Sequence, residues 1–374
     1  MRTFESIVVC LFALYLTYYC RRHYSSTSEE ILEAVTPIFE NIQKSDIMAS
    51  IKEVLLPATA TGTPTASTLF EAPTVVPDTP STLTTSRRVA KAFEAIEQSE
   101  GAGARVRRSV GTAQLRNFSP FLMLDHFTIG PGAGFPDHPH RGQETITYLL
   151  SGSVDHEDFA GNKGTIGPGD LQFMTAGKGI MHAEMPGLAS TTPNVGLQLW
   201  VDLPTALKFC EPRYRDLRGD EIPVVEADDG KVSIKIISGE SQGAEGVREL
   251  AYTPVWILDV TVKAGGTLKQ ILPKAWNAFL YILEGSIIVE GKDVPTFHNV
   301  VFEKEGDGIV VEGKTDARFV IIAGQPLDQP VVQHGPFVLN TKEQVYEAMR
   351  DYHGYQNGFE RAEGWRSEIG KRMD

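Results

Sequence analysis

The sequence of 374 residues has few cysteines, no excess of basic residues and no long apolar run. Its three cysteines are an odd number: Cys10 and Cys20 share one N-terminal segment, and Cys210 stands alone. This pattern excludes a disulfide scaffold and favours a reducing compartment. The formal net charge is -13, so we expect no direct binding of nucleic acid through bulk charge, because phosphate binding needs a positive surface.

The most apolar stretch, residues 4–20, is shorter than the roughly 20 apolar residues that span a bilayer. It also lacks the small-residue cleavage site of a signal peptide. Two interpretations stay open: a membrane anchor that leaves the rest of the chain in the cytosol, because Arg21 and Arg22 follow it, or a mispredicted gene start or mobile tail. We expect the protein in the cytoplasm, the nucleus or both, with membrane tethering through residues 4–20 as the alternative.

Residues 57–86 contain no lysine or arginine and are rich in threonine, proline, alanine and serine, which predicts a flexible linker. We therefore expect a non-globular extension over residues 1–86 and a folded body from Arg87. In that body, short apolar runs alternate with glycine, proline, asparagine and aspartate, as is typical of β-barrels and sandwiches. The clearest predicted strands are 144–150, 232–237, 256–262, 279–283 and 318–322.

An internal repeat predicts that the barrel is duplicated. The sequence YLLSGS at 148–153 is matched by YILEGS at 281–286, and the Gly-Asp pair at 169–170 is matched by another at 306–307. Two such matches favour two tandem barrels, over 87–215 and 216–374, rather than a solenoid, which needs at least about three repeats. Near the C-terminus, Thr341 and Gln344 have the spacing of a helix capping box, so we expect a short helical tail that packs on a barrel.

Two short motifs carry the chemistry. His138 and His140 are two residues apart, as are His182 and Glu184. On extended strands such pairs point to one face, so neighbouring strands that face one barrel interior would bring three imidazoles and one carboxylate together. Glu144 has the same parity as the first pair and is the rival carboxylate. A mixed imidazole and carboxylate set suits iron, manganese, zinc, nickel or copper, and four protein ligands leave coordination positions open.

The second barrel is predicted to hold no metal. When the halves are aligned on the repeat, its matching positions carry residues that bind metals poorly: Ile271, Pro273 and Asn277. One metal per chain follows. The remaining histidines lack a second ligand nearby and are interpreted as surface or satisfied core residues: His23, His126, His156, His298, His334 and His353. The sequence contains no phosphate-binding loop and no nucleophile elbow.

Five longer motifs, at 98–109, 134–145, 169–177, 179–186 and 333–337, closely resemble the pirin family of two-barrel cupins. The resemblance runs from about residue 87 to the end. It implies an all-β fold of two tandem cupin (double-stranded β-helix, or jelly-roll) barrels, with one mononuclear non-haem iron in the first barrel and none in the second. The metal ligands implied by the family are His138, His140, His182 and Glu184, with Glu144 behind them.

The resemblance implies two functions, between which the sequence does not choose. One is a redox-responsive regulator of a transcription factor, which we favour. The other is a quercetin 2,3-dioxygenase that opens a flavonol with dioxygen, in which Glu184 is both ligand and candidate catalytic base. A metal that only clamps the barrel is a third reading. We expect a monomer whose partner is a transcription factor or a flavonol. The chain departs from the family in its extension before Arg87 and in His126, where pirins usually carry an acidic or small residue.

Overall fold

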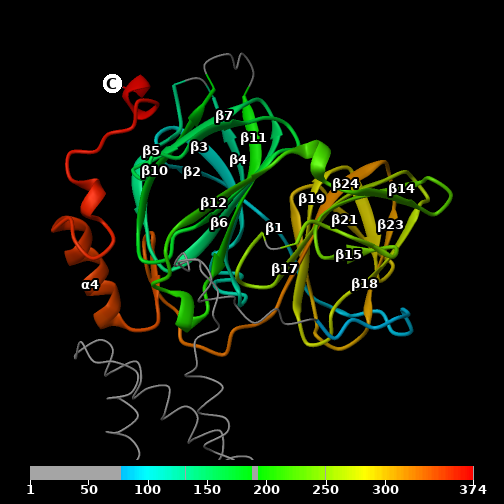
Figure 1. Cartoon of the computed structure of the whole chain (residues 1–374). Coiled ribbons are helices and arrows are strands. Elements are labelled where there is room, and N and C mark those ends of the chain that lie inside the picture. The colour runs from blue at the N-terminus through cyan, green and yellow to red at the C-terminus, as the bar shows by residue number, and fades with distance from the viewer. Residues whose placement is uncertain (1–76, 131, 188–192, 249, 374) are drawn as a thin grey trace, which may run out of the picture. The chain divides into compact units, whose positions relative to one another are not determined.

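The computed structural model describes residues 77–130, 132–187, 193–248 and 250–373 (Figure 1). The predicted anchor at 4–20 and the linker up to residue 76 lie outside the described residues. Within the described ranges, no helix is long and apolar enough to cross a membrane. The described body consists mainly of strands and contains one α-helix, α4 (Lys342–His353).

Both barrels are built from a seven-stranded and a four-stranded antiparallel sheet. In the N-terminal barrel the larger sheet has the order β12 (Arg213–Leu217), β9 (Leu171–Thr175), β6 (Gln143–Ser151), β11 (Asn194–Asp202), β4 (Phe121–Ile129), β3 (Ala104–Val110) and β2 (Glu97–Glu100). Its smaller sheet has the order β5 (Phe135–His140), β10 (Ile180–Pro186), β7 (Val154–Asp158) and β8 (Lys163–Ile166).

The C-terminal barrel repeats this order. Its larger sheet is β1 (Val89–Glu94), β22 (His298–Phe302), β19 (Asn277–Glu284), β24 (Ala317–Gly324), β17 (Val255–Val262), β14 (Val232–Ser238) and β13 (Val224–Ala227). Its smaller sheet is β18 (Thr267–Ile271), β23 (Gly308–Gly313), β20 (Ser286–Val289) and β21 (Lys292–Pro295). The predicted all-β fold of two cupin barrels and the five predicted strands are therefore confirmed.

The shorter elements connect the barrels or decorate them. Two small hairpins are formed by β15 (Glu240–Ser241) with β16 (Ala244–Glu245), and by β25 (Val332–His334) with β26 (Phe337–Leu339). Single 3-10 turns are η3 (Thr205–Leu207), η4 (Gly219–Glu221), η5 (Glu360–Ala362) and η6 (Gly370–Met373). The predicted capping box is present at the start of α4, where Thr341 accepts a hydrogen bond from the amide of Gln344.

One part of the repeat is not structurally equivalent. The Gly-Asp pair at 169–170 precedes β9, whereas the pair at 306–307 precedes β23, which matches β10 in the sheet order. The YLLSGS and YILEGS segments do lie at matching places, at the ends of β6 and β19. Turns of any barrel favour glycine and aspartate, so the second match arises from turn chemistry rather than from duplication.

The strands between the barrels are buried on both faces. In β19, Ala278, Leu280 and Ile282 belong to the interior of the C-terminal barrel. The alternating Phe279 and Tyr281 belong to a second cluster, to which both barrels contribute. Because successive side chains of a strand point to opposite faces, burial on both faces explains why this segment reads as one continuous apolar run.

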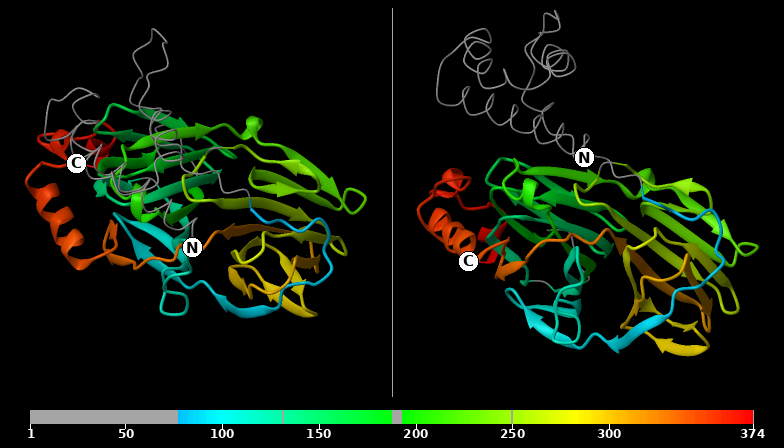
Figure 2. Two further views of the ribbon diagram at one scale, coloured as in Figure 1. Left: turned by 60° about the horizontal axis from the view of Figure 1, so that its bottom comes forward. Right: turned by 90° about the horizontal axis from the view of Figure 1, so that it is seen from below.

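The N-terminal arm belongs with the C-terminal barrel. The amides of Thr84 and Thr85 both donate to Oδ2 of Asp307 at 3.1 Å. Arg87 is buried, and β1 pairs with β22 along its length, as the arm running beside that barrel in Figure 2 shows. The sequence predicts that the linker ends at residue 86 and that the N-terminal domain begins at residue 87. In the structure, residues on both sides of this boundary instead contact the C-terminal barrel. Linker-like composition does not exclude pairing with a distant strand, because backbone hydrogen bonds do not depend on side-chain identity.

The C-terminal tail crosses in the other direction. It follows the C-terminal barrel in the chain, yet η6 lies against β5 and β10 of the N-terminal barrel (Figure 1). Side chains of α4 and β26 share an apolar cluster with Met181 of β10. The sequence predicts that the tail packs on a barrel and belongs to the C-terminal domain, residues 216–374. Its packing instead joins it to the smaller sheet of the first barrel.

Candidate metal centre

The two histidine motifs lie on neighbouring strands, as the sequence predicts. β5 and β10 pair antiparallel, with His138 opposite His182 and His140 opposite Ile180. The register shifts between His182 and Glu184, so that Glu184 lies opposite Phe135. The pairing explains why residues 42 or more positions apart in sequence can share one centre. Residues two positions apart on a strand point to the same face, and the pairing of the two strands brings these faces side by side.

The three imidazoles form one compact cluster. Their ring centroids are 4.4 Å apart for His138 and His182, 4.9 Å for His138 and His140, and 5.0 Å for His140 and His182. One nitrogen of each lies within 4.8 Å of the others, and both His140 and His182 are 1% exposed. Among the described residues, this is the one group of three or more ligand side chains with that geometry. The cluster has the donor type and the spacing that a metal ion requires.

Burial keeps the cluster uncharged. Desolvation, and then the proximity of His138, places the pKa of His140 well below its ordinary value. Desolvation and the neighbouring imidazoles do the same to the pKa of His182, and desolvation also lowers the pKa of His138. Neutral imidazoles carry a lone pair, and a metal ligand must be in that state.

Several of these nitrogens lack any protein partner. Nε2 of His140 and both ring nitrogens of His182 are buried without a hydrogen bond to the described residues. His138 differs, because its Nδ1 lies 2.8 Å from the carbonyl of Pro136, which leaves Nε2 for a ligand bond. Buried polar atoms are normally satisfied, so a set of unpartnered nitrogens converging on one point fits a bound metal.

Gln143 orients His140. Its side-chain amide lies 2.7 Å from Nδ1 of His140, and its oxygen has no partner within the described structure. A half-turn of the amide exchanges its oxygen and nitrogen. Nδ1–H then donates to the amide oxygen, and the Nε2 lone pair is left for a metal. Metal-bound histidines almost always have such an outer partner, which fixes the tautomer. Gln143 is not among the predicted site residues, although it lies between His140 and Glu144 inside the motif.

Glu184 lies in the same barrel interior but outside the imidazole cluster. It is 4% exposed, its Oε1 accepts from the hydroxyl of Thr147 at 2.8 Å, and its Oε2 accepts from Nε2 of Gln198 at 3.0 Å. Both partners are neutral, and no ion pair of Glu184 is found in the described ranges. The carboxylate is therefore oriented by two hydrogen bonds without being neutralised. Thr147 and Gln198 are two further site residues, and no sequence motif indicates either of them.

The rival carboxylate has another role. Glu144 accepts hydrogen bonds from Thr175 at 2.8 Å and from the amides of Tyr252 and Thr253 at 3.0 and 3.1 Å. These amides belong to the segment just before β17, so Glu144 links the two barrels. Its oxygens are occupied by those donors, which favours Glu184 as the carboxylate of the centre.

Of the other described histidines, His156 lies on a strand next to this site. It lies on β7 opposite Glu184, and its Nε2 is 3.2 Å from Oδ2 of Asp216. Its ring stacks on Tyr214 with an interplanar angle of 6°. It is therefore a buried histidine with its own partner, as expected. The prediction for His23 lies outside the described residues.

The matching region of the C-terminal barrel is largely apolar, and its buried Gln270 is bound to Ser241. Pro273 follows β18, and the register partner of Ile271 across β18 and β23 is Gly308. The interior next to them is filled by aliphatic residues such as Leu268, Leu280 and Val311. Among the described residues, no second group of three or more His, Cys, Asp or Glu side chains has the spacing of metal ligands. The absence of a metal from this barrel stays a prediction.

These features define a two-barrel cupin with a histidine-lined candidate metal centre in its first barrel. The Pirin family model matches residues 103–201, and the model of the Pirin C-terminal cupin domain matches residues 257–358. Human Pirin is 47% identical over 293 residues, covering 76% of this chain and 99% of that protein. A Pirin-like protein of Solanum lycopersicum is 48% identical over 286 residues, or 75% and 97% of the two chains. The chain belongs to the pirin family.

Solved structures agree with the fold. A structure described as quercetin 2,3-dioxygenase from Acinetobacter baumannii superposes with a TM-score of 0.68 at 29% identity, covering 72% of this chain and 98% of that one. GK1651 from Geobacillus kaustophilus gives a TM-score of 0.59 at 34% identity, covering 66% and 98%. The similarity extends over nearly the whole of each of these proteins.

Proposed function

We propose that the chain binds one iron ion through His138, His140, His182 and Glu184 and acts as a quercetin 2,3-dioxygenase. The observation that carries the proposal is the cluster of buried, neutral imidazoles with unpartnered nitrogens beside an oriented carboxylate. The donor set fits iron as well as several other divalent metals, and the family resemblance favours iron. The structural neighbour described as a quercetin 2,3-dioxygenase supports the choice of reaction.

In this reaction dioxygen is the oxidant. Both of its atoms enter the opened flavonol, and one ring carbon leaves as carbon monoxide. A bound iron ion would supply Lewis-acid and redox chemistry. The part assigned to this chain is proton transfer: Glu184 accepts the proton of the flavonol hydroxyl while Thr147 and Gln198 hold its carboxylate in place. A positioned general base typically contributes 100-fold to 10,000-fold in rate.

The test is direct. The protein is loaded with iron without oxygen, mixed with quercetin and exposed to air, while flavonol absorbance and carbon monoxide are followed. We expect loss of absorbance with release of carbon monoxide. Protein that carries full iron and leaves the flavonol unchanged would contradict the oxygenase proposal.

Glu184→Gln tests the base. The substitution keeps the size but removes the basicity, so turnover should fall at least about 100-fold while the three histidines retain part of the metal. Glu312→Gln is the matched control, because Glu312 is an exposed glutamate on β23, the counterpart of β10. If Glu184→Gln turns over flavonol at the wild-type rate, Glu184 is not the base that accepts the proton.

The second candidate is a redox-responsive regulator of a transcription factor. It is favoured by the position of Arg141, which directly follows His140 and pairs with Asp351 on the surface helix α4. A change of one charge unit at the centre can act on that surface through this contact. Hydrogen exchange over residues 342–373 in the ferrous and ferric forms tests it, and identical exchange in both forms would argue against a regulator.

A further inference from the structure

The strand that carries two ligands is held from its outer side by the C-terminal tail. On β5, His138 and His140 face the barrel interior, so the alternating Asp137 and Pro139 face outward, and Arg141 continues that series. Figure 1 shows the tail running beside β5 and β10, and η6 contacts both strands. The ligand strand therefore lies between the metal centre and the tail.

Arg141 is the first attachment. It is 1% exposed, and its three nitrogens all donate: Nη1 to Asp351 at 2.8 Å, Nη2 to the carbonyl of Asn357 at 2.7 Å, and Nε to the carbonyl of Lys178 at 2.5 Å. The guanidinium also lies 4.8 Å from the ring centre of Phe359. A buried cation with this many partners fixes the backbone next to His140.

The end of the tail makes the second attachment. The hydroxyl of Ser367 donates to Oδ1 of Asp137, and its amide donates to Oδ2 at 3.2 Å. The amides of Glu368 and Ile369 donate to Glu157 of β7 at 2.9 and 3.3 Å. Ile369 packs on Ala183 of β10, between the ligands His182 and Glu184. The tail thus touches β5, β7 and β10 at residues that alternate with those of the site.

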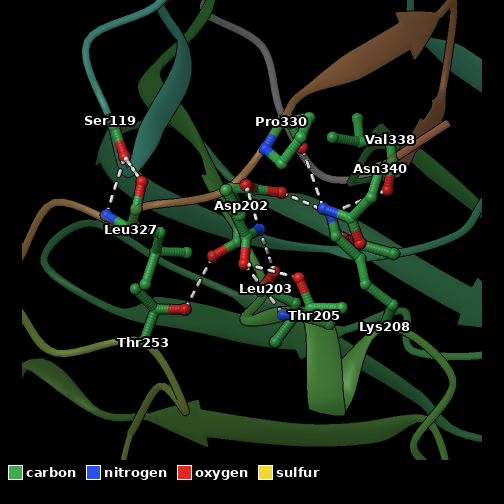
Figure 3. Close-up of polar contacts among 12 residues, drawn as sticks. Ser119, Asp202, Leu203, Thr205, Lys208, Thr253, Leu327, Pro330, Val338 and Asn340 are labelled. Carbon is green, nitrogen blue, oxygen red and sulfur yellow. Dashed lines mark hydrogen bonds and ion pairs between the residues drawn. The ribbon is translucent and has the colours of Figure 1, made fainter.

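The segment that leads into the tail makes the third attachment (Figure 3). Nζ of Lys208 donates to the carbonyls of Gly142 at 2.7 Å and Val338 at 2.8 Å, and to Asp202. Gly142 lies between Arg141 and Gln143, and Gln143 contacts His140. Lys208 therefore binds the incoming segment and the turn that follows the ligand strand to the same point.

We propose that the tail, residues 342–373, is a positioning part of the metal centre, acting through Arg141 and Asp137 on the strand that bears His138 and His140. The inference rests on the proposed binding of a metal. A centre needs its ligands within about 0.5 Å of the productive geometry, and partners that hold ligands change metal affinity about 10-fold to 100-fold. The tail residues act through the backbone of β5, so we expect the lower end of that range.

The experiment uses the full chain and Co(II) as the metal, because its visible absorption reports on coordination geometry. Asp351→Asn removes the charge opposite Arg141 at nearly constant size, and Ser367→Ala removes the hydroxyl that binds Asp137. Each should weaken Co(II) binding about 10-fold, change its visible spectrum and raise hydrogen exchange over residues 135–141. Ser367→Ala, the milder change, keeps the test valid if the other variant does not fold.

Two controls separate positioning from stability. Glu347→Gln lies on α4 as well, but its ion pair with Arg350 is exposed and 3.9 Å long, so affinity should not change. Val260→Ala creates a cavity in the C-terminal barrel and should lower the melting temperature without weakening Co(II) binding.

Wild-type affinity and spectrum in both tail variants would overturn the proposal, and so would a loss no larger than that of Val260→Ala. If the wild-type chain binds neither Co(II) nor iron, the proposed function fails instead. In that case hydrogen exchange over residues 135–141 in the metal-free protein still tests the positioning role of the tail. Unchanged exchange in both tail variants overturns that role, and raised exchange supports it.

Discussion

Lys208→Met removes a buried cation from the point where the incoming C-terminal segment meets the first barrel, while keeping a side chain of similar length. Lys208 and Asp202 are both 1% exposed, and the remaining two donors of the lysine bind the carbonyls of Gly142 and Val338. Figure 3 shows Lys208 together with Asp202 and Val338. The substitution leaves one carboxylate and two carbonyls without their donor.

The expected loss follows from burial. Desolvation lowers the pKa of Lys208 and raises the pKa of Asp202, in each case against the attraction of the partner, so burial is the larger effect on both groups. Such a pair adds little net stability, but removing one partner costs about 3–5 kcal/mol, because the other charge stays buried. Asp202 keeps its bond from Gln329 at 2.7 Å, so we expect about 4 kcal/mol rather than more.

Urea unfolding followed by near-ultraviolet circular dichroism measures this loss. Lys208→Met with Asp202→Asn should recover about 2 kcal/mol relative to the single lysine variant, because no charge is then left unpaired. Lys178→Met is the matched control: its pair with Glu211 is exposed and should contribute no more than about 1 kcal/mol. A loss below about 1 kcal/mol for Lys208→Met, or a double variant that loses the sum of the single losses, would refute this reasoning.

Three further predictions concern pH, the N-terminal arm and the metal. Burial, and secondarily Arg107, lowers the pKa of His126 from 6.5 to about 4, so as the pH falls the unfolded chain binds the proton first. The free energy of unfolding should drop by up to about 3 kcal/mol between pH 6.5 and 4. In urea unfolding, His126→Gln should lack this part of the pH dependence. An equal pH dependence in the variant and the wild type would contradict the prediction. Arg87→Met removes two hydrogen bonds to carbonyls of the C-terminal barrel and should cost about 2–4 kcal/mol, whereas the exposed Arg88→Met should stay within about 0.5 kcal/mol. Elemental analysis after iron-replete growth should give one iron per chain, and two metals or stoichiometric zinc alone would count against the proposed centre.

The sequence was sufficient for the barrels and for most of the centre because both depend on local parity. Alternation predicts that His138 and His140 share a face, and the same rule applies to His182 and Glu184. Pairing of β5 with β10 then brings three of these four side chains into one cluster. The prediction that the second barrel holds no metal rests on the alignment of the two halves.

The rest depends on contacts that no local pattern encodes. The pairing of β1 with β22 joins residues about 200 positions apart, and Arg141 meets Asp351 across 210 positions. Arg141 reads in the sequence as one more surface arginine, because burial of a charge is decided by the partners that surround it. The same holds for Lys208, which shows no periodicity or motif.

The interface between the barrels shows which features duplication kept and which it changed. Leu197 pairs with both His126 and Tyr148, and in the other barrel Val320 pairs with both Asp259 and Tyr281. His126 and Asp259 are therefore equivalent positions, although one is a histidine and the other an aspartate.

Each of the two tyrosines reaches across to the opposite barrel. The hydroxyl of Tyr148 donates to Asp259 at 2.6 Å, and that of Tyr281 lies 3.2 Å from Nδ1 of His126. The interface contact survives in both directions even though one partner differs in charge, because a neutral imidazole and a carboxylate can both accept from a phenol.

The two barrel interiors, unlike the interface, have diverged in chemistry. On β6 the inward position before Tyr148 is Thr147, which holds Glu184, whereas the equivalent position on β19 is Leu280, part of the apolar interior. A polar interior is costly unless its groups are paired, and in the first barrel Thr147 and Gln198 pair with Glu184. The segment that leaves the second barrel after β24 accepts a hydrogen bond from Lys208 at the carbonyl of Val338, and it ends in η6, which contacts β5 and β10. If the tail positions the ligand strand as proposed, the second barrel contributes to the centre by covering the interface and by anchoring the start of that segment.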